Sequence, residues 1–599
     1  MTAITQKPQT GAEAVRWDLS DLYQAPDDPQ IEADIQTALN YADAFAERYH
    51  SQVASLDAPA LAEAVAALEA IVGLLNKLGS YATLLWTTDT ANPVLGKLLA
   101  RVQELGNKVN QKVLFFELEW AAAPEEVAAL ADAPELERYR HYLNMERIAA
   151  PYRRAESEEQ IMSQLGLTGS SGWGRFFGEY VSGLKYPWEG EMITQSEILA
   201  KVYHPDRDVR RMAAESVTGV LQDHTQTTGY IFNMILLDKA SRDEIRGYES
   251  WITARNLSNQ VADETVNALI EAVTSRYDIV QRYYAVLRDV LGVDELYDYD
   301  RYAPVSDVEK HVLWDEAHTM VLDAYGQFSG TMADIAGQFF TKGWIDAPPA
   351  PSKRGGAYSM SGPVAVHPYI FMNYEGKLNS VFTLAHELGH GIHQYLARDK
   401  GEFGADTPLT TAEMASTFGE MLTFDYLIAQ ENDPATRLSM RMERAASTFA
   451  TVFRQVSMNR FEEAMHLTRR ESGELSTEQF NTLWLETQRA MFGDSVTLRD
   501  DYGVWWSYIP HFIQSPGYVY AYAFGELLVW ALYARYQSSG DKAAFAAAYE
   551  EVLRAGGSDY PYNILRPLAV DLQDPAFWHE GLNLISDFVS EIERDAAQR

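Results

Sequence analysis

Two histidines and a glutamate stand together in the segment His386-Glu387-Leu-Gly-His390, and their spacing favours metal chemistry. On a helix, residues four positions apart share a face and are separated by about 6 Å, so both imidazoles can bind one zinc ion. Glu387 lies on the flank of that face, where its carboxylate can reach a water on the metal without replacing a ligand. Zinc lowers the pKa of such a water and the glutamate can accept its proton, which is the arrangement for metal-assisted hydrolysis of a peptide bond.

A chance match is the competing interpretation of this pattern. With 13 histidines among 599 residues, a random occurrence somewhere in the chain is expected at about a few per cent. The motif alone therefore supports a hypothesis. His393 is near the same face, but on a straight helix it lies about 10 Å along the axis from His386, too far to share the metal with both other histidines. We expect His393 to support the site or to pack beside it.

The residues around the motif have the period of an α-helix. Apolar residues recur at spacings of three and four and form one stripe, which consists of Val381, Leu384, Leu388, Ile392 and Leu396. The two histidines of the motif fall on nearly the opposite side. The sequence therefore predicts a metal helix over about 380–400 that is buried on both sides, and Gly401 stands where a helix commonly ends.

A third metal ligand must come from another part of the chain, and the next predicted helix offers one. Glu413 and Glu420 are seven residues apart and share a helical face. Glu413 also follows Thr410 at the spacing of a capping box, in which the carboxylate would only accept a hydrogen bond from a backbone N–H. The residues alone leave metal ligation and capping about equally favoured.

The segment from His386 to His393, followed by Ala-Glu413-Met-Ala-Ser-Thr-Phe-Gly-Glu420, resembles the M3 family of zinc oligopeptidases, and within it the oligoendopeptidase F branch. The resemblance implies that Glu413 is the third ligand of one zinc ion per chain. It also implies that Glu420 supports the site from behind the ligands and that the enzyme class is peptidase.

Composition limits the classes of protein and of partner. A chain of 599 residues with 47% hydrophobic and 22% charged residues is typical of a globular protein with two or more lobes. Its formal charge of −36 argues against nucleic acid and anionic membranes as partners. The chain has no cysteine, its first residues lack the apolar core of a signal peptide, and no apolar run reaches the ~18 residues of a membrane span. We expect a cytoplasmic protein, and the sequence leaves its oligomeric state open.

The first 200 residues have the pattern of one helix after another. Helical periodicity with alanine-rich filling predicts helices over 31–49, 59–88, 92–123 and 125–147. The opening segment from Trp17 to Tyr23 also resembles the N-terminus of the oligoendopeptidase F branch. We expect an N-terminal helical lobe at 1–200 and a catalytic domain of M3 type at 201–599.

Strand-like sequence appears directly before the metal helix. Residues 353–359 and 364–374 are rich in β-branched and aromatic residues and predict a small sheet within 353–374, beside the active site. Pro368 indicates that the second strand is an edge strand or is irregular nearby. An edge strand can hold an extended peptide by backbone hydrogen bonds; the alternative is a hairpin that only supports the helix. The candidate substrate-binding residues are Gly355, Gly356, Tyr369 and His367, although a structural role is commoner for this histidine.

A histidine and several tyrosines follow in the segment from Tyr508 to Gly525. Attack on a peptide carbonyl develops an oxyanion, and histidine and tyrosine can donate hydrogen bonds to it at neutral pH. A buried aromatic helix is the commoner interpretation of such a segment, but the family carries a histidine followed by Gly-Tyr and further tyrosines here. His511, Tyr518 and Tyr522 are therefore the candidate oxyanion donors, and Tyr520 is out of phase. The spacing between His511 and Tyr518 departs from that of the relatives, which leaves open which tyrosine donates.

The fold that these observations predict is mainly α, a two-lobed helical zinc-peptidase fold with a small β-sheet beside the active-site helix. The resemblance implies a deep substrate channel that admits short, unstructured peptides and excludes folded proteins. The predicted function is a zinc-dependent endopeptidase acting on oligopeptides. The alternatives are a zinc carboxypeptidase of similar helical fold and a non-catalytic peptide-binding protein whose zinc is structural, with no open coordination position.

Overall fold

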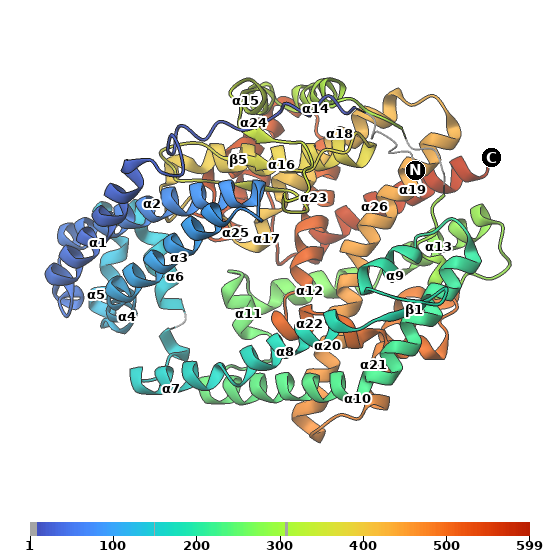
Figure 1. Cartoon of the computed structure of the whole chain (residues 1–599), viewed down its shortest axis with the longest axis horizontal. Coiled ribbons are helices and arrows are strands. Elements are labelled where there is room, and N and C mark those ends of the chain that lie inside the picture. The colour runs from blue at the N-terminus through green and yellow to red at the C-terminus, as the bar shows by residue number, and fades with distance from the viewer. Residues whose placement is uncertain (1–8, 149, 306–309, 599) are drawn as a thin grey trace. The chain divides into compact units, whose positions relative to one another are not determined.

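The computed structural model describes residues 9–148, 150–305 and 310–598, which are mainly helical (Figure 1). Residue contacts divide the chain into two compact units, each assembled from three segments. Unit 1 consists of Met1–Pro151, Glu309–Gln430 and Tyr536–Asp571. Unit 2 consists of Tyr152–Val308, Glu431–Arg535 and Leu572–Arg599. The lobes predicted at 1–200 and 201–599 divide the chain at a single point, and that division stays a prediction.

Unit 1 contains the following helices: α1 (Pro29–Tyr49), α2 (Ala58–Thr88), α3 (Pro93–Val113), α4 (Phe115–Ala122), α5 (Glu125–Ala128), α6 (Arg140–Ile148), α14 (Trp314–Phe328), α15 (Gly330–Thr341), α16 (Leu378–Ala397), α17 (Leu409–Ala412), α18 (Met414–Gln430), α24 (Lys542–Ala555) and α25 (Pro561–Ile564). The helix predicted over 92–123 is divided between α3 and α4. The one predicted over 125–147 is broken into short pieces around Pro134, which cannot donate a helical hydrogen bond.

Unit 2 contains the following helices: α7 (Glu156–Gly166), α8 (Ser170–Gly183), α9 (Gln195–Lys201), α10 (Arg207–Arg246), α11 (Thr253–Ser258), α12 (Asp263–Thr274), α13 (Tyr277–Leu291), α19 (Pro434–Thr451), α20 (Phe453–Ser472), α21 (Thr477–Phe492), α22 (His511–Gln514), most of α23 (Tyr520–Ser538) and α26 (Pro575–Ala596). Its core surrounds α10, where the ring of Phe232 meets that of Trp506 at 4.7 Å. A short hairpin of β1 (Tyr186–Trp188) and β2 (Glu191–Ile193) lies in the same unit.

The N-terminal part of unit 1 is a helical layer of α1, α2 and α3 around an apolar core. Asp57 caps α2 by accepting a hydrogen bond from the N–H of Ala60, and Leu61 and Leu68 are buried in the core. Among the described residues, α2 is the one helix long and apolar enough to cross a membrane, by length and composition alone. The expectation that no apolar segment reaches this length overlooked α2, because charged residues interrupt its sequence.

Three short strands form a sheet in unit 1: β3 (Ile345–Asp346), β4 (Tyr358–Met360) and β5 (Tyr369–Phe371). Their order is β3-β5-β4, with β5 parallel to β3 and antiparallel to β4. Of the two alternatives that Pro368 indicated, the edge strand is wrong, because β5 pairs on both sides, whereas irregular backbone near the proline is confirmed, because β5 begins only at Tyr369. The edge strand next to α16 is β4, since Ser359 Oγ donates a 2.7 Å hydrogen bond to Gln394 Oε1.

A buried lysine holds this sheet to the loop that precedes β4. Lys353 Nζ donates hydrogen bonds to Asp346 Oδ1 at 2.6 Å, to the carbonyl of Met372 at 2.7 Å and to that of Pro348 at 3.0 Å. The side chains of Lys353 and Asp346 are each only 2% exposed. A buried charge is tolerated only when it is paired and hydrogen-bonded, so this lysine fixes β3, β5 and the loop together.

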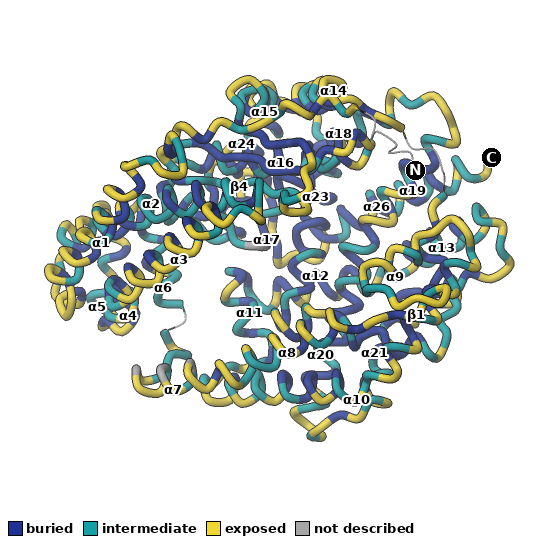
Figure 2. The backbone as a smooth tube through the Cα atoms, viewed as in Figure 1, coloured by how far each residue is buried: buried dark blue, intermediate teal, exposed yellow. Residues whose placement is uncertain are grey.

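The predicted metal helix is α16, followed by a short 3-10 helix (Arg398–Lys400) and by Gly401 at φ +77°. Its apolar stripe is buried, with Val381, Leu384 and Leu388 fully enclosed. Much of the helix is dark blue in Figure 2, which marks buried residues. The helix is therefore held on its apolar side by the core of unit 1, which fixes the direction of its other face.

Candidate metal centre

Helices α16 and α18 approach each other so closely that two glycines are required between them. A Cβ atom at Gly389 would lie 2.3 Å from the carbonyl oxygen of Ala415, and one at Gly419 would lie 1.9 Å from the hydroxyl of Tyr325. That hydroxyl donates a 2.8 Å hydrogen bond to the carbonyl of Ala385 in α16. The close approach brings the acidic residues around the start of α18 within reach of the histidines of α16.

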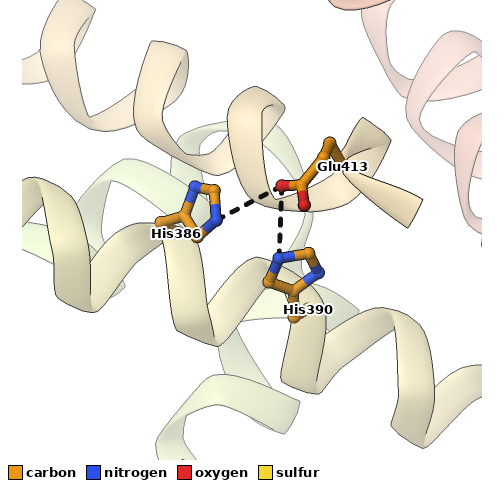
Figure 3. A group of neighbouring side chains, drawn as sticks. All are labelled: His386, His390 and Glu413. Carbon is orange, nitrogen blue, oxygen red and sulfur yellow. Dashed lines mark ion pairs between the residues drawn. The ribbon is translucent and has the colours of Figure 1, made fainter. Parts of the chain in front are cut away.

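His386, His390 and Glu413 converge on one point, as Figure 3 shows. Glu413 Oε2 lies 3.3 Å from the Nε2 atoms of both histidines, and the three potential ligand atoms are all within 4.8 Å of one another. Glu413 stands between α17 and α18, where its Oε2 also accepts a hydrogen bond of 2.9 Å from Ser416 Oγ. Because the residue that caps α17 is Pro408, Thr410 is not at a capping position, and the capping-box interpretation of Glu413 fails.

Glu420 contacts His386 on the side of the imidazole ring that faces away from the metal position. Its Oε1 lies 2.6 Å from His386 Nδ1, so the imidazole can donate its Nδ1–H and keep Nε2 free for a metal. Burial opposes the charged imidazole, but the hydrogen bonds with Glu413 and Glu420 outweigh it and raise the pKa of His386 to about 10. Burial raises the pKa of the Glu413 carboxyl, yet its bonds with His386 and His390 hold that pKa far below the usual range. A divalent cation would take the place of the shared protons.

Glu387 is buried beside these ligands. The residue is 5% exposed, and its Oε2 has no hydrogen-bond partner among the described residues. Burial raises the pKa of this carboxyl, with the charges of His386 and His390 acting in the opposite direction. An unpartnered carboxylate oxygen next to two imidazoles and a carboxylate is what a site for a metal and its water requires.

A cavity of about 380 Å³ opens over the cluster. One wall is Ala357, Tyr358 and Ser359, which are the residue before β4 and the first two residues of that edge strand. The remaining lining comes from α16 and from the segment before α18: His386, Glu387, His390, His393, Gln394, Ala405, Asp406, Thr407, Ala412 and Glu413. An edge strand therefore lies directly beside the candidate metal centre, within one compact unit.

His393 lines the same cavity but is not part of the three-residue group. It is 4% exposed, and its Nε2 has no partner among the residues that the structure describes. Burial lowers the pKa of this imidazole to about 3, and the neighbouring His390 acts in the same direction. A neutral histidine packed behind the ligands is compatible with the predicted supporting role.

The structure does not bring His367 and Tyr369 to the cavity. The imidazole of His367 stacks on Trp344 at 3.8 Å, and its Nε2 lies 3.0 Å from Asp21 Oδ2. Tyr369 is fully buried, with its ring 6.3 Å from that of Trp17. Tyr369 is the first residue of the central strand and His367 lies just before that strand. Both side chains pack into the interior, so the predicted contacts of these two residues with substrate fail.

Gly355 and Gly356 lie in the exposed loop before β4, outside the lining of the cavity. Gly356 has a φ of +83°, which favours glycine, and its carbonyl accepts a hydrogen bond from Asn373 Nδ2. A role of these two residues in substrate binding stays a prediction.

The predicted oxyanion donors form a cluster of their own in unit 2. His511 Nε2 lies 3.3 Å from the hydroxyl of Tyr522, and the rings of Tyr518 and Tyr522 meet edge to face at 4.9 Å. Burial lowers the pKa of His511, which keeps the imidazole neutral. Tyr520 is fully buried and bonds to Asn256 and Asn259, in accordance with its being out of phase.

Sequence reasoning missed the residues that shape the site without touching the metal position. Gly389, Gly419 and Tyr325 set the distance between α16 and α18, and Ser416 orients the carboxylate of Glu413. A glycine inside a helical pattern was the available signal for close packing at Gly389. The partner across the contact depends on tertiary structure and leaves no mark in the local sequence.

A helix that presents two histidines and a buried glutamate, facing a carboxylate from the next helices, defines a metallopeptidase. Comparison with known proteins gives the family. The profile described as Peptidase family M3 matches residues 201–584, and the one described as Oligopeptidase F matches residues 119–186. The chain belongs to peptidase family M3.

Individual relatives agree with this assignment. Oligopeptidase PepF of Bacillus subtilis is 26% identical over 543 residues, which cover 89% of this chain and 80% of the relative. Group B oligopeptidase PepB of Streptococcus agalactiae is 25% identical over 535 residues, which cover 88% of each chain. The predicted family and enzyme class are confirmed.

Solved structures share the fold. A crystal structure from Chlamydophila abortus matches with a TM-score of 0.87 at 23% identity, over 97% of this chain and 98% of the other. Oligoendopeptidase-F from Enterococcus faecium matches with a TM-score of 0.71 at 21% identity, over 96% of this chain and 100% of the other. The predicted fold class, mainly helical with a small sheet, is confirmed.

Proposed function

We propose that this member of family M3 is a zinc-dependent oligoendopeptidase, which hydrolyses internal bonds of short, unstructured peptides. The observation that carries the proposal is the convergence of His386, His390 and Glu413, with the unpartnered carboxylate of Glu387 beside them. Two imidazoles and one carboxylate are the donor set of catalytic zinc sites, which keep one coordination position open. The relatives whose names specify oligopeptidases and oligoendopeptidases support the substrate class.

The side chains of α16 and its neighbours have distinct roles in this proposal. His386, His390 and Glu413 would hold one zinc ion per chain, which when bound supplies a Lewis acid and lowers the pKa of water. Glu387 accepts a proton at its carboxylate from the attacking water and passes it to the leaving amine. Glu420 keeps the His386 ring in the tautomer that presents Nε2, and His393 packs behind the ligands.

The tyrosine cluster would supply hydrogen bonds to the oxyanion that forms during attack. His511, Tyr518 and Tyr522 carry N–H and O–H groups that can donate hydrogen bonds, and the contact between His511 and Tyr522 supports a joint role. Oxyanion donors of this kind typically contribute about 10²–10³-fold to kcat. Either tyrosine can be the direct donor in this proposal.

The edge strand β4 would bind the backbone of the substrate. Its place at the edge of the sheet and the cavity beside it would allow an extended peptide to add a strand, with Gly355 and Gly356 permitting close approach of the chain. Recognition through the backbone tolerates many side chains, which suits a peptidase acting on varied short peptides. The proposed setting is the cytoplasm, with peptides as partners and with no nucleic-acid or membrane partner.

A length series of peptides blocked at both ends tests the proposal. Mass spectrometry should show internal cleavage of the shorter members, loss of cleavage with a chelator, and recovery when zinc is restored. Cleavage only of peptides with a free C-terminus would support a carboxypeptidase instead. Metal-independent cleavage, or zinc binding without any cleavage, would exclude the proposed role of the cluster.

A further inference from the structure

Unit 2 contains a cavity of about 390 Å³ whose lining shares no residue with the candidate metal centre. Parts of α13, α19 and α20 form its wall, together with the segment at 301–305. Polar side chains stand in this wall among apolar ones, and they include Arg301, Arg454, Tyr203, Tyr283, Tyr284 and Tyr302. Two cationic groups and four phenols around one cavity call for an explanation, because metallopeptidase chemistry uses none of them.

Arg301 is buried and forms no ion pair with a carboxylate of the residues that the structure describes. Its Nε donates to the carbonyl of Asp298 at 2.8 Å and its Nη2 donates to the hydroxyl of Tyr502 at 3.0 Å, and the guanidinium lies 5.0 Å from the ring centre of Phe492. The carboxylate of Asp298 is occupied elsewhere, since Arg499 binds both of its oxygens at 2.8 Å. Cation–π contacts and the charge of Asp298 offset part of the cost of burying this group, and no carboxylate among the described residues forms an ion pair with it.

Arg454 has still fewer partners. Its Nη1 donates to the hydroxyl of Tyr302 at 3.3 Å, and among the described residues it forms no ion pair with a carboxylate. A guanidinium carries five N–H donors, so most of those on Arg454 have no acceptor among the described residues. Burial alone would raise the pKa of Tyr302, but the charges of Arg301 and Arg454 outweigh it and lower that pKa. The two guanidinium groups therefore create a positive potential inside the cavity.

The one acidic side chain in the lining does not neutralise this charge. Glu443 accepts a hydrogen bond of 3.3 Å from Ser439 Oγ and forms no ion pair with either arginine. Burial raises the pKa of this carboxyl. The arginine end of the cavity is thus positive, while Met442, Phe449 and Met491 make other parts of the wall apolar.

We infer that this cavity is a binding site for a small organic anion, specifically a carboxylate attached to an aromatic body. Its carboxylate would accept hydrogen bonds from Arg301 and Arg454, because a guanidinium matches a carboxylate in both shape and charge. Tyr302 and its neighbours would add hydroxyl donors, and the ring would pack against the apolar wall. A volume of about 390 Å³ lies within the ~300–1,000 Å³ range of small-molecule sites.

Isothermal titration calorimetry of the zinc-loaded full chain with benzoate and with benzamide tests this site. The two probes have nearly the same shape, and only benzoate carries the charge. Benzoate should bind at least ~10-fold more tightly than benzamide, because hydrogen bonds to charged groups are the stronger ones. Arg454→Met should weaken benzoate binding by at least ~10-fold, while Arg175→Met, which removes an exposed arginine paired with Glu179, should leave it unchanged.

Two further measurements distinguish binding in the cavity from binding at the catalytic zinc and from misfolding of the variant. Benzoate could bind the catalytic zinc instead, and it would then bind Arg454→Met as tightly as the wild type and lose its binding when a chelator is added. Binding to the wild type that survives the chelator supports the cavity even if Arg454→Met fails to fold, which circular dichroism would reveal. Equal affinity for the two probes, or no saturable binding of benzoate, would overturn the inference.

Discussion

Replacing Gly389 with alanine tests whether the close packing of α16 on α18 holds the metal centre together. The new Cβ would lie 2.3 Å from the carbonyl oxygen of Ala415 and 2.6 Å from Cα of Ser416. Both are backbone atoms, which cannot rotate away as the end of a side chain can. The helices must therefore move apart by roughly 1 Å before the contact reaches an ordinary van der Waals distance.

A matched control variant isolates the free-energy cost of the clash at Gly389. Gly106 lies inside α3 of the same unit, and a Cβ there would meet nothing within 4 Å. Both replacements gain the helix preference of alanine over glycine, about 0.5–1 kcal/mol, so this contribution cancels in the comparison. The remaining difference is the cost of overpacking, about 1–3 kcal/mol, and contact with backbone places Gly389→Ala towards the upper end.

Two measurements follow from this reasoning. Urea denaturation of metal-free protein should show Gly389→Ala less stable than Gly106→Ala by that amount. Competition with a chromophoric chelator should show zinc bound at least ~10-fold more weakly by Gly389→Ala, because Ser416 and Glu413 move with the displaced backbone. Equal stability and equal zinc affinity of the two variants would refute the idea that the glycine contact positions the ligand.

Four further changes have defined outcomes. Glu387→Gln should keep its zinc, measured by metal analysis, and lose about 10²–10⁴-fold in kcat as the general base is removed; full activity would exclude that role. Glu420→Gln should weaken zinc binding by about 10–100-fold in chelator competition, because its bond to a ligand histidine is impaired. Lys353→Met should lower the free energy of unfolding by up to about 3–5 kcal/mol, since it leaves the buried carboxylate of Asp346 with the half-exposed Arg16, 3.7 Å away, in place of a buried partner; a loss below about 1 kcal/mol would contradict this. Burial raises the pKa of Glu462 to about 8, above the ~4.3 of an unfolded chain. The folded state therefore binds this proton more tightly than the unfolded state, and the free energy of unfolding falls as the pH rises from about 4.3 to 8. Glu462→Gln should flatten that fall in urea titrations at pH 5 and pH 8, and an unchanged slope would count against it.

The parts of the fold that local sequence predicts are those whose cause is local. Helix α16 follows from an apolar residue at every third or fourth position, and the facing of His386 and His390 follows from their spacing along that helix. Both are properties of about 20 consecutive residues. The same reasoning predicted β4 and β5 as strands, because β-branched and aromatic residues cluster there.

Predictions failed where the cause lies between distant segments. The position of β5 at the centre of the sheet depends on β3, a strand of only two residues, which is too short to leave an alternating pattern in the sequence. Tyr369 became part of the interior for the same reason, since a central strand is covered on its faces. The residues alone could not decide between ligation and capping for Glu413, because the decision depends on how α18 packs on α16.

The position of Glu413 explains why packing and metal binding form one property of this site. The two histidines come from the middle of a helix whose apolar side is fully buried, so they cannot adjust to a displaced partner. Glu413 lies between α17 and α18, so the direction of its backbone depends on the first turn of α18. The orientation of its carboxylate depends on the hydrogen bond from Ser416. The distance between the ligands is thus set by the contact at Gly389. A change in that contact must alter zinc affinity even though no ligand is replaced, whereas a change of equal size elsewhere in unit 1 must not.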